Sequence, residues 1–225
     1  MTTVIHRPIT FVPHFQVLGV ELHDLSAEDI AERVAEAVLA QRRVLVVNAN
    51  AHMLTLAQRR RWLRTFFKQA DIAFCDGVGV QFAARLLTGR LPHRTTPPEW
   101  IEAAARRIGP TGTVFWLGGA RDVVGHAAAL FAERTGTRCA GWQHGFFDAR
   151  TGSADNLRIV AEINRVSPDL LVVNMGMPRQ EQWLRDHWHL LNAAPASPPG
   201  HWWTISLDVS AGRRAGWPTW VWSGP

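Results

Sequence analysis

The sequence contains little lysine, little cysteine and no long apolar run. Lys68 is the only lysine, so nearly all of the net charge of +5 comes from arginine. A GC-rich gene explains this bias as well as a binding surface does. A weakly basic protein favours anionic partners such as phosphates, acidic lipids or nucleic acid. No block of like charges selects among these partners.

The two cysteines, Cys75 and Cys139, form no CxxC pair, which indicates a reduced compartment. No apolar run approaches the roughly 20 residues of a membrane span, and the N-terminus lacks the regions of a signal peptide. We therefore expect a cytoplasmic protein that is able to sit on a membrane surface. HExxH, Cys/His ligand sets and GxSxG are also missing, so a structural metal or a serine nucleophile is not expected.

What is present is a chain of 225 residues in which short apolar runs alternate with helical patterns. Such alternation predicts a Rossmann-like α/β fold, with one parallel sheet covered by helices on both faces. We expect strands over 17–22, 43–48, 72–75, 113–119, 138–143 and 169–176. We expect helices over 26–41, 51–68, 78–88, 97–108, 121–135, 155–166 and 178–191.

The composition divides the chain into three parts. Residues 1–16 have no clear period and form a loose arm, and residues 17–192 form the domain. Residues 193–225 hold five of the eleven tryptophans without a convincing period, so we expect a poorly ordered tail.

Four polar or glycine-rich loops follow the expected strands: "NAN", "DGVG", "GGAR" and "NMGMPRQE". In open α/β sheets ligands bind outside the carboxyl ends of the strands, so Asp76 in "DGVG" would point into a shared crevice. The structural alternative is that Asp76 only caps the next helix. Because Asp76 opposes a thiolate at Cys75, a catalytic cysteine is disfavoured.

The glycine-rich loops first suggest dinucleotide binding. However, "GVGVQF" places Phe82 where GxGxxG needs its third glycine, which makes a plain NAD-dependent enzyme a weak alternative. A glycine loop that leads into a helix still holds a diphosphate through its amides and the helix dipole, and this suits a nucleotide sugar equally well.

Six motifs occur together in order: "NANAHMLTLA", "DGVGV", "RTTPPEW", "WLGGA", "HGFF" and "GMPRQEQW". As an ordered set they resemble the WecG/TagA/CpsF family of bacterial glycosyltransferases, family 26, over about residues 17–192. The resemblance implies transfer of a sugar, of the N-acetylmannosamine type or a hexose, from a UDP-sugar to a polyprenyl-diphosphate-linked acceptor. It implies inversion at the anomeric carbon and products that feed teichoic acid or cell-surface polysaccharide.

The resemblance also assigns roles to single residues. Asp76 matches a catalytic base, Asn50 matches an active-site asparagine, and Arg94 matches an arginine that binds the diphosphate or the acceptor. The remaining expected substrate-binding residues are Asn48, where threonine is common, Gln180 and Glu181 of the PxQE motif, and the loop glycines Gly118 and Gly145. "RTTPPEW" replaces the RVxGxD form of some members, which leaves the acceptor open.

No DxD motif is placed to hold a metal against the diphosphate, so we expect no cofactor and no metal. The expected partners are the UDP-sugar, the lipid-linked acceptor and the inner face of the cell membrane, without nucleic acid; an oligomer stays open. From residue types alone, Arg94 is equally interpretable as a surface arginine and Gln180 as a helix N-terminal residue without a ligand.

The tail departs from the family pattern, which ends in a basic segment and a Gly-Leu-Glu-Trp element. Read in a shifted frame with suitable codons, "WVWSG" encodes Gly-Leu-Glu-Trp, so we hypothesise that 193–225 is a frameshifted product. A family member with such a tail would bind nucleotide sugar but transfer it poorly. A catalytically impaired binding protein is therefore the main alternative to an active hexosyltransferase.

Overall fold

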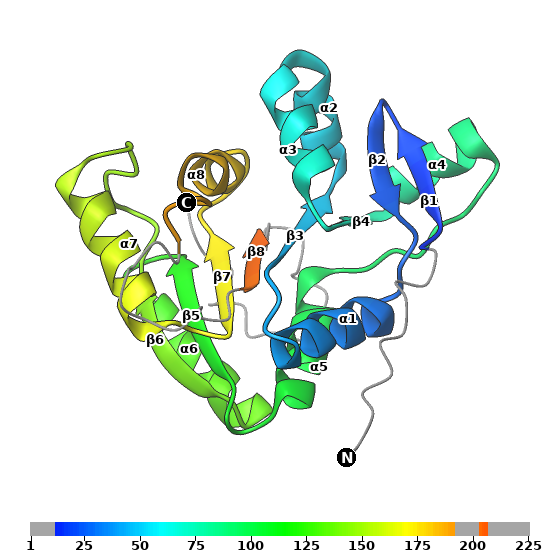
Figure 1. The fold of residues 1–225 in the computed structure, drawn as a ribbon. Coiled ribbons are helices and arrows are strands. Elements are labelled where there is room, and N and C mark those ends of the chain that lie inside the picture. The colour runs from blue at the N-terminus through cyan, green and yellow to red at the C-terminus, as the bar shows by residue number, and fades with distance from the viewer. Residues whose placement is uncertain (1–11, 192–202, 207–225) are drawn as a thin grey trace.

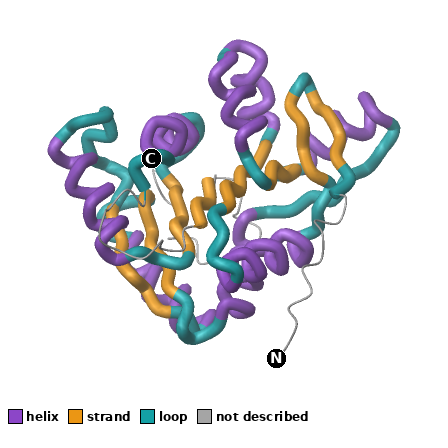
Figure 2. Tube along the Cα trace, in the orientation of Figure 1, coloured by secondary structure: helices purple, strands orange, loops and turns teal. Residues whose placement is uncertain are grey.

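The computed structural model describes residues 12–191 and 203–206, and Figure 1 shows their arrangement. The described strands form one eight-stranded sheet in the order β1-β2-β4-β3-β8-β7-β5-β6. Every neighbouring pair is parallel except β1 with β2. Helices cover both faces of this sheet, as Figure 2 shows, so the expected Rossmann-like α/β fold is confirmed.

The elements alternate along the chain much as the apolar pattern predicts. The strands are β1 (His14–Val17), β2 (Val20–His23), β3 (Val44–Ala49), β4 (Ile72–Cys75), β5 (Thr113–Gly118), β6 (Arg138–Gln143), β7 (Leu170–Asn174) and β8 (Trp203–Ser206). The helices are α1 (Ala27–Leu39), α2 (Ala51–Arg59), α3 (Arg61–Gln69), α4 (Val78–Thr88), α5 (Pro97–Ile108), α6 (Val124–Thr135), α7 (Ala154–Val166) and α8 (Arg179–His187).

Two apolar cores lie on the two faces of the sheet. Strand β3 shows how the pleat divides them: Leu45 and Val47 belong to one core, whereas Val44 and Val46 belong to the other. The first core is completed by α2, α3, α4, α7 and α8, and the second by α1, α5 and α6. Because β3 is buried on both faces, a ligand can reach its polar residues only at the carboxyl end of the strand.

The expectation of a single strand over 17–22 is wrong. The chain reverses at Leu18 and Gly19, whose φ angles are 51° and 73°, and β1 pairs with β2 as an antiparallel hairpin. Positive φ at both turn positions matches the twist of a two-residue hairpin. Residues 14–16, which the sequence places in a loose arm, are part of β1; residues 1–11 lie outside the described residues.

The single helix expected over 51–68 is also wrong, since the chain breaks at Arg60 (φ −123°, ψ 96°) into α2 and α3. A continuous helix would carry the buried stripe of Met53 and Ala57 on to Arg61 and Arg64. The break instead turns Leu63, Phe66 and Phe67 inward, which keeps the arginines out of the core.

Strand β8 comes from the segment that the sequence sets apart from the domain. It lies between β3 and β7 and pairs with both in parallel register. The sheet therefore includes four residues from beyond the expected boundary at 192. The rest of the expected tail, and with it the frameshift hypothesis, lies outside the described residues.

Within residues 12–191 and 203–206, no helix combines the length and the apolar character that crossing a bilayer requires.

Trp100 anchors α5 to the sheet: it is fully buried and meets Phe74 of β4 edge-to-face, with ring centroids 6.1 Å apart. We expect Trp100→Ala to lower the free energy of unfolding by about 3–5 kcal/mol, because it leaves a large cavity. Urea denaturation followed by circular dichroism measures this loss. The control Leu39→Ala removes a side chain that is 72% exposed and should cost less than about 0.5 kcal/mol. Equal losses for both variants would contradict the assigned packing.

Candidate active site

At the carboxyl ends of the strands, which we call the carboxyl edge of the sheet, polar residues from strands far apart in the sequence lie at the same height. Val46 of β3 and Val172 of β7 both align with Ile205 of β8. Asn48 and Asn174 lie two residues further on, so the register places them level and two strand spacings apart. Two spacings are about 10 Å, enough to separate two ends of a small ligand. The strand order changes direction here, where open α/β sheets bind ligands.

Asp76 is buried at this edge, with 1% of its surface exposed. Asn48 is equally buried, and its Nδ2 donates a hydrogen bond of 2.6 Å to Oδ2 of Asp76. The backbone N–H of Asp76 donates to the carbonyl oxygen of Ala49, extending the β3–β4 ladder by one bond. Helix α4 takes Gly77, and not Asp76, as its N-cap residue. The structure thus joins the two predicted residues Asn48 and Asp76 directly.

Asn48 has a second polar atom in the same place. Its Oδ1 atom is buried and has no hydrogen-bond partner among the residues that the structure describes. A buried acceptor without a partner costs about 1–3 kcal/mol, which a ligand hydroxyl or amide would recover. Oδ1 of Asn48 is therefore a candidate contact for a ligand beside Asp76.

Arg94 lies on the loop that runs past the end of β4. The next residue, Thr95, is held there because its N–H donates to the carbonyl oxygen of Cys75 at 3.0 Å and its hydroxyl to the carbonyl oxygen of Leu25 at 3.1 Å. The Arg94 side chain is 40% exposed and lies 3.8 Å from a carboxylate oxygen of Glu99. This long, exposed ion pair leaves the guanidinium able to reach an anionic ligand.

Cys75 is a buried thiol at the end of β4. Burial, followed by the charges of Asp76 and Asp24, raises the pKa of Cys75 to about 12, although Arg94 opposes the shift. A raised pKa favours the protonated thiol at neutral pH, which is consistent with the expectation that a catalytic cysteine is disfavoured.

Asn50 begins α2 beside this cluster. It is the N-cap residue, and its Oδ1 accepts a hydrogen bond of 2.9 Å from the N–H of Met53. This contact gives Asn50 a structural task, and the side chain is only partly buried at the same edge. Its predicted role in binding stays a prediction.

Gly118 and Gly145 belong to the other half of the edge, at the ends of β5 and β6. A Cβ at Gly118, where φ is +133°, would lie 1.8 Å from the carbonyl oxygen of Asn174. The N–H of Gly119 donates to that oxygen, and the N–H of Gly145 donates to the carbonyl oxygen of Gly119, both at 2.9 Å. The absence of a side chain at Gly118 therefore lets three loops lie against one another.

Gln180 and Glu181 form a buried pair in the first turn of α8, with 0% and 1% of their surfaces exposed. Nε2 of Gln180 donates to Oε1 of Glu181 at 2.9 Å, and Oε1 of Gln180 accepts from the N–H of Met175 at 3.2 Å. Gln180 therefore ties the loop after β7 to α8. The structure brings these two predicted residues together. Strands of the sheet lie between this pair and Asp76.

Two residues at this edge were not selected from the sequence. Arg179 donates to the carbonyl oxygens of Gly145 at 2.6 Å and Phe147 at 2.8 Å, which fastens the "HGFF" loop to α8. Asn174 lies level with Asn48. The signal for Asn174 is the string "LVVN", which ends β7 and stands one residue before the end of β3.

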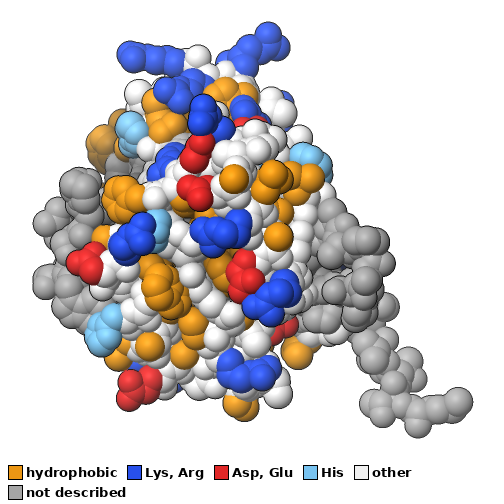
Figure 3. All heavy atoms as spheres, turned by 90° about the vertical axis from the view of Figure 1, so that its left-hand side faces the viewer, with side chains coloured by type: hydrophobic (Ala, Val, Ile, Leu, Met, Phe, Trp, Pro, Cys, Tyr) orange, Lys and Arg blue, Asp and Glu red, His pale blue; other side chains and the backbone are white. Residues whose placement is uncertain are grey.

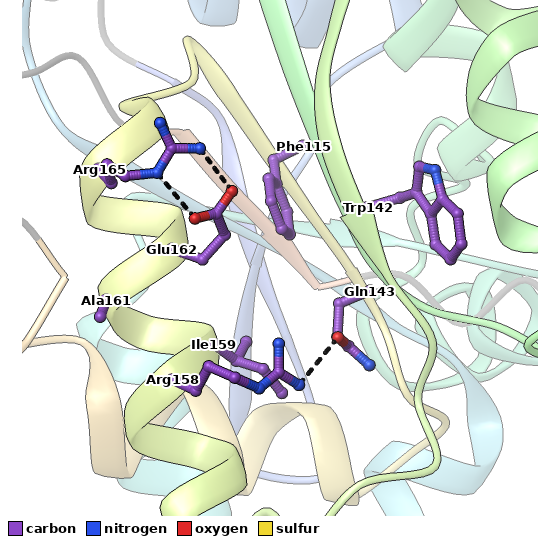
Figure 4. A pocket seen from close by; sticks show the side chains of 8 residues that line it. All are labelled: Phe115, Trp142, Gln143, Arg158, Ile159, Ala161, Glu162 and Arg165. Carbon is purple, nitrogen blue, oxygen red and sulfur yellow. Dashed lines mark hydrogen bonds and ion pairs between the residues drawn. The ribbon is translucent and has the colours of Figure 1, made fainter.

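A pocket of about 560 Å³ lies elsewhere, between β6 and α7 (Figure 4). It contains none of the predicted residues. Its charged groups are satisfied by neighbours, since Arg165 pairs with Glu162 and Arg158 donates to Gln143. We therefore place the candidate site at the strand ends, where buried polar groups converge, and not in this pocket.

No cluster of three or more His, Cys, Asp or Glu side chains suited to a metal ion occurs in the described part of the chain. The expected independence from metal stays a prediction.

The sheet order and the buried polar residues together define a doubly wound α/β protein with its polar site at the carboxyl ends of the strands. The sequence profile described as "Glycosyl transferase WecG/TagA/CpsF family" matches residues 15–223. The chain therefore belongs to this family of glycosyltransferases, and the expected family is confirmed. The match also extends beyond the region 17–192 over which the motifs were recognised.

Several similar proteins carry the same name. The chain is 25% identical, over 201 residues, to the N-acetylglucosaminyldiphosphoundecaprenol N-acetyl-beta-D-mannosaminyltransferases of Staphylococcus aureus strains NCTC 8325, COL and MRSA252. The alignments cover 88% of this chain and 76% of each relative. A role in glycosyl transfer is thereby supported.

The contact at Gly118 generates a test of this edge. We expect Gly118→Ala to lower the free energy of unfolding by more than about 2 kcal/mol, because the new Cβ meets backbone atoms at a positive φ. Thermal or urea denaturation measures the change. Gly145→Ala is the matched control, since its Cβ would have its nearest neighbour at 3.4 Å, and it should cost less than about 1 kcal/mol. A Gly118→Ala protein as stable as the control would refute the close approach of the loops.

Proposed function

We propose that this protein transfers a sugar from a UDP-sugar to a polyprenyl-diphosphate-linked sugar, with inversion at the anomeric carbon. The observation that carries the proposal is the buried Asp76 carboxylate, held by Asn48 at the carboxyl edge of the sheet. The family and the name of the staphylococcal relatives supply the acceptor class. An N-acetylmannosamine-type donor is the first candidate for the same reason.

In the proposed reaction Asp76 acts as the general base. The acceptor hydroxyl oxygen forms a bond to the anomeric carbon while the bond from that carbon to the diphosphate oxygen breaks. The hydroxyl proton passes to the Asp76 carboxylate, and UDP leaves with the bonding electron pair. A positioned base contributes about 10²–10⁴ in rate, and attack opposite the leaving group inverts the configuration.

Charge on the departing diphosphate needs cationic and N–H partners. Arg94 is a candidate cation, because its loop is bonded to the end of β4 and its ion pair with Glu99 is exposed. The N-terminus of α4 begins directly after Asp76 and adds a positive dipole end. The N–H groups of Gly119 and Gly145 already donate to carbonyl oxygens, so other backbone N–H groups of the loops after β5 and β7 would face the other end of the nucleotide sugar. With such groups the transfer is expected to proceed without a metal.

Asp76→Asn tests the base directly. We expect this variant to remain folded and to bind UDP normally, because the amide keeps the shape of the carboxylate, while kcat falls by about 10²–10⁴. Calorimetric titration with UDP and transfer to a polyprenyl-diphosphate-linked sugar provide the two measurements. Asp186→Asn, which changes a surface aspartate paired with Arg185 on α8, is the control and should retain full turnover.

Turnover by Asp76→Asn at the wild-type rate would exclude the base role. UDP binding by the wild-type protein without transfer to any lipid acceptor would instead favour a catalytically impaired member of the family. Binding of NAD without UDP would favour an oxidoreductase.

Arg94→Ala tests the diphosphate contact. We expect a weaker affinity for UDP, by about tenfold, because one charge-assisted hydrogen bond is lost. Arg94→Lys should recover only part of it, since lysine lacks the planar fork. The control Arg106→Ala removes another exposed arginine, paired with Glu102 on α5. Equal UDP affinity in Arg94→Ala and Arg106→Ala would place Arg94 outside the site.

A further inference from the structure

Helix α4 exposes apolar side chains in an unusual concentration. Five of the ten large hydrophobic side chains exposed in the described part of the chain fall within residues 78–91. Val78, Phe82 and Leu86 are 67%, 62% and 70% exposed and follow one another at intervals of four, so they share one side of the helix. The opposite side packs through Val80 and Ala84 into the core. We call Val78, Phe82 and Leu86 the α4 face.

The charge around the α4 face is mainly positive, although Glu21 of the neighbouring β1–β2 hairpin is an exposed acid. Residues 51–98 contain eight arginine and lysine residues against two aspartates, a net charge of +6 with neutral histidine, whereas the whole chain carries +5. Of these aspartates, Asp76 is buried, and Asp71 precedes β4 at its amino end, away from α4. The acids that flank the segment are paired, Asp24 with His93 and Glu99 with Arg94.

The cationic residues and the α4 face belong to one side of the molecule. A Cβ at Gly79 would lie 3.4 Å from Cβ of Ala51, so α4 and α2 begin side by side. Further along, α4 packs on β1, and α3 packs on β2, which pairs with β1. Figure 1 shows α2, α3, the β1–β2 hairpin and α4 as neighbours at the end of the sheet farthest from α7. By contrast, acidic and basic side chains are interspersed on the α7 side in Figure 3.

We propose that the α4 face and the arginines beside it dock on an anionic lipid bilayer, with Val78, Phe82 and Leu86 entering the interface. An amphipathic helix with exposed apolar residues and flanking cations binds such a surface through burial and charge together. A second copy of the chain fits less well, because a symmetric contact across this face would bring two segments of charge +6 together.

Docking by α4 has a consequence for the site. Asp76 and Gly77 immediately precede the helix, so a docked α4 brings the base to the membrane surface, where a lipid-linked diphosphate resides. This deepens the proposed function and rests on it for the identity of the acceptor. The docking itself is measurable without any transfer reaction.

The test is flotation of the full chain with vesicles of phosphatidylcholine that contain or lack phosphatidylglycerol. We expect binding to the phosphatidylglycerol vesicles, and a loss of at least about tenfold for the double variant Phe82→Glu/Leu86→Glu. The double variant Arg85→Gln/Arg90→Gln should weaken binding to the anionic vesicles by about fivefold for each charge. Leu39→Glu/Leu157→Glu is the matched control, because both side chains are exposed on other helices, and it should bind like the wild type.

Wild-type binding by Phe82→Glu/Leu86→Glu, or an equal loss in the control, would overturn the proposal. A change from dimer to monomer in light scattering, with vesicle binding intact, would likewise overturn it and identify a contact between copies. Circular dichroism and UDP titration verify that the variants are folded.

Activity separates this proposal from the proposed function. If both hold, Phe82→Glu/Leu86→Glu transfers sugar normally to a short-chain, water-soluble acceptor but poorly to an acceptor embedded in vesicles. If the wild type binds vesicles through α4 yet transfers to neither acceptor, the proposed function fails and the docking surface stands.

Discussion

The polar site at the carboxyl ends of the strands depends on the hydrogen bond between Asn48 and Asp76. It is 2.6 Å long, it is buried, and it joins the ends of two neighbouring parallel strands. A carboxylate in such a place needs a donor, because burying an unpaired charge costs several kcal/mol. The carboxyl ends of β3 and β4 must therefore keep their register for this bond to form. Helices α2 and α4 begin shortly after these ends, so the same register sets where they start.

The sequence predicts the fold well wherever an apolar run is continuous. Strands β3, β4, β5 and β7 are buried on both faces, so their composition identifies them without knowledge of their neighbours. The β1–β2 hairpin is missed because "VLGVEL" is apolar on both sides of its turn, which imitates one strand. The break at Arg60 is missed because "RRR" contains no residue that ends a helix; only the change of buried stripe reveals it. Strand β8 is missed because parallel pairing in the middle of a sheet is a tertiary property of a short, unremarkable run.

The residues of the site likewise divide into those that the sequence predicts and those that it misses. Asp76 and Asn48 are predictable from residue type and strand position, and the structure joins them. Gln180 and Glu181 are found by motif. The structure adds that their hydrogen bonds hold the loop after β7 against α8, which the motif does not indicate. Arg179 and Asn174 are missed because their importance lies in backbone contacts and register between distant loops. Spacing along a sequence identifies side chains for chemistry more readily than it identifies those that hold loops together.

The position of β8 has a consequence for the order in which the chain can fold. Strand β8 follows all the other described strands in the sequence, yet it lies between β3 and β7. During synthesis, β1–β4 and β5–β7 are made first and each keeps an unsatisfied inner strand edge until β8 arrives. Open edges of this kind invite pairing with other chains. Completion of the sheet is thus a late, long-range event, and aggregation of nascent chains competes with it for as long as those two edges stay open.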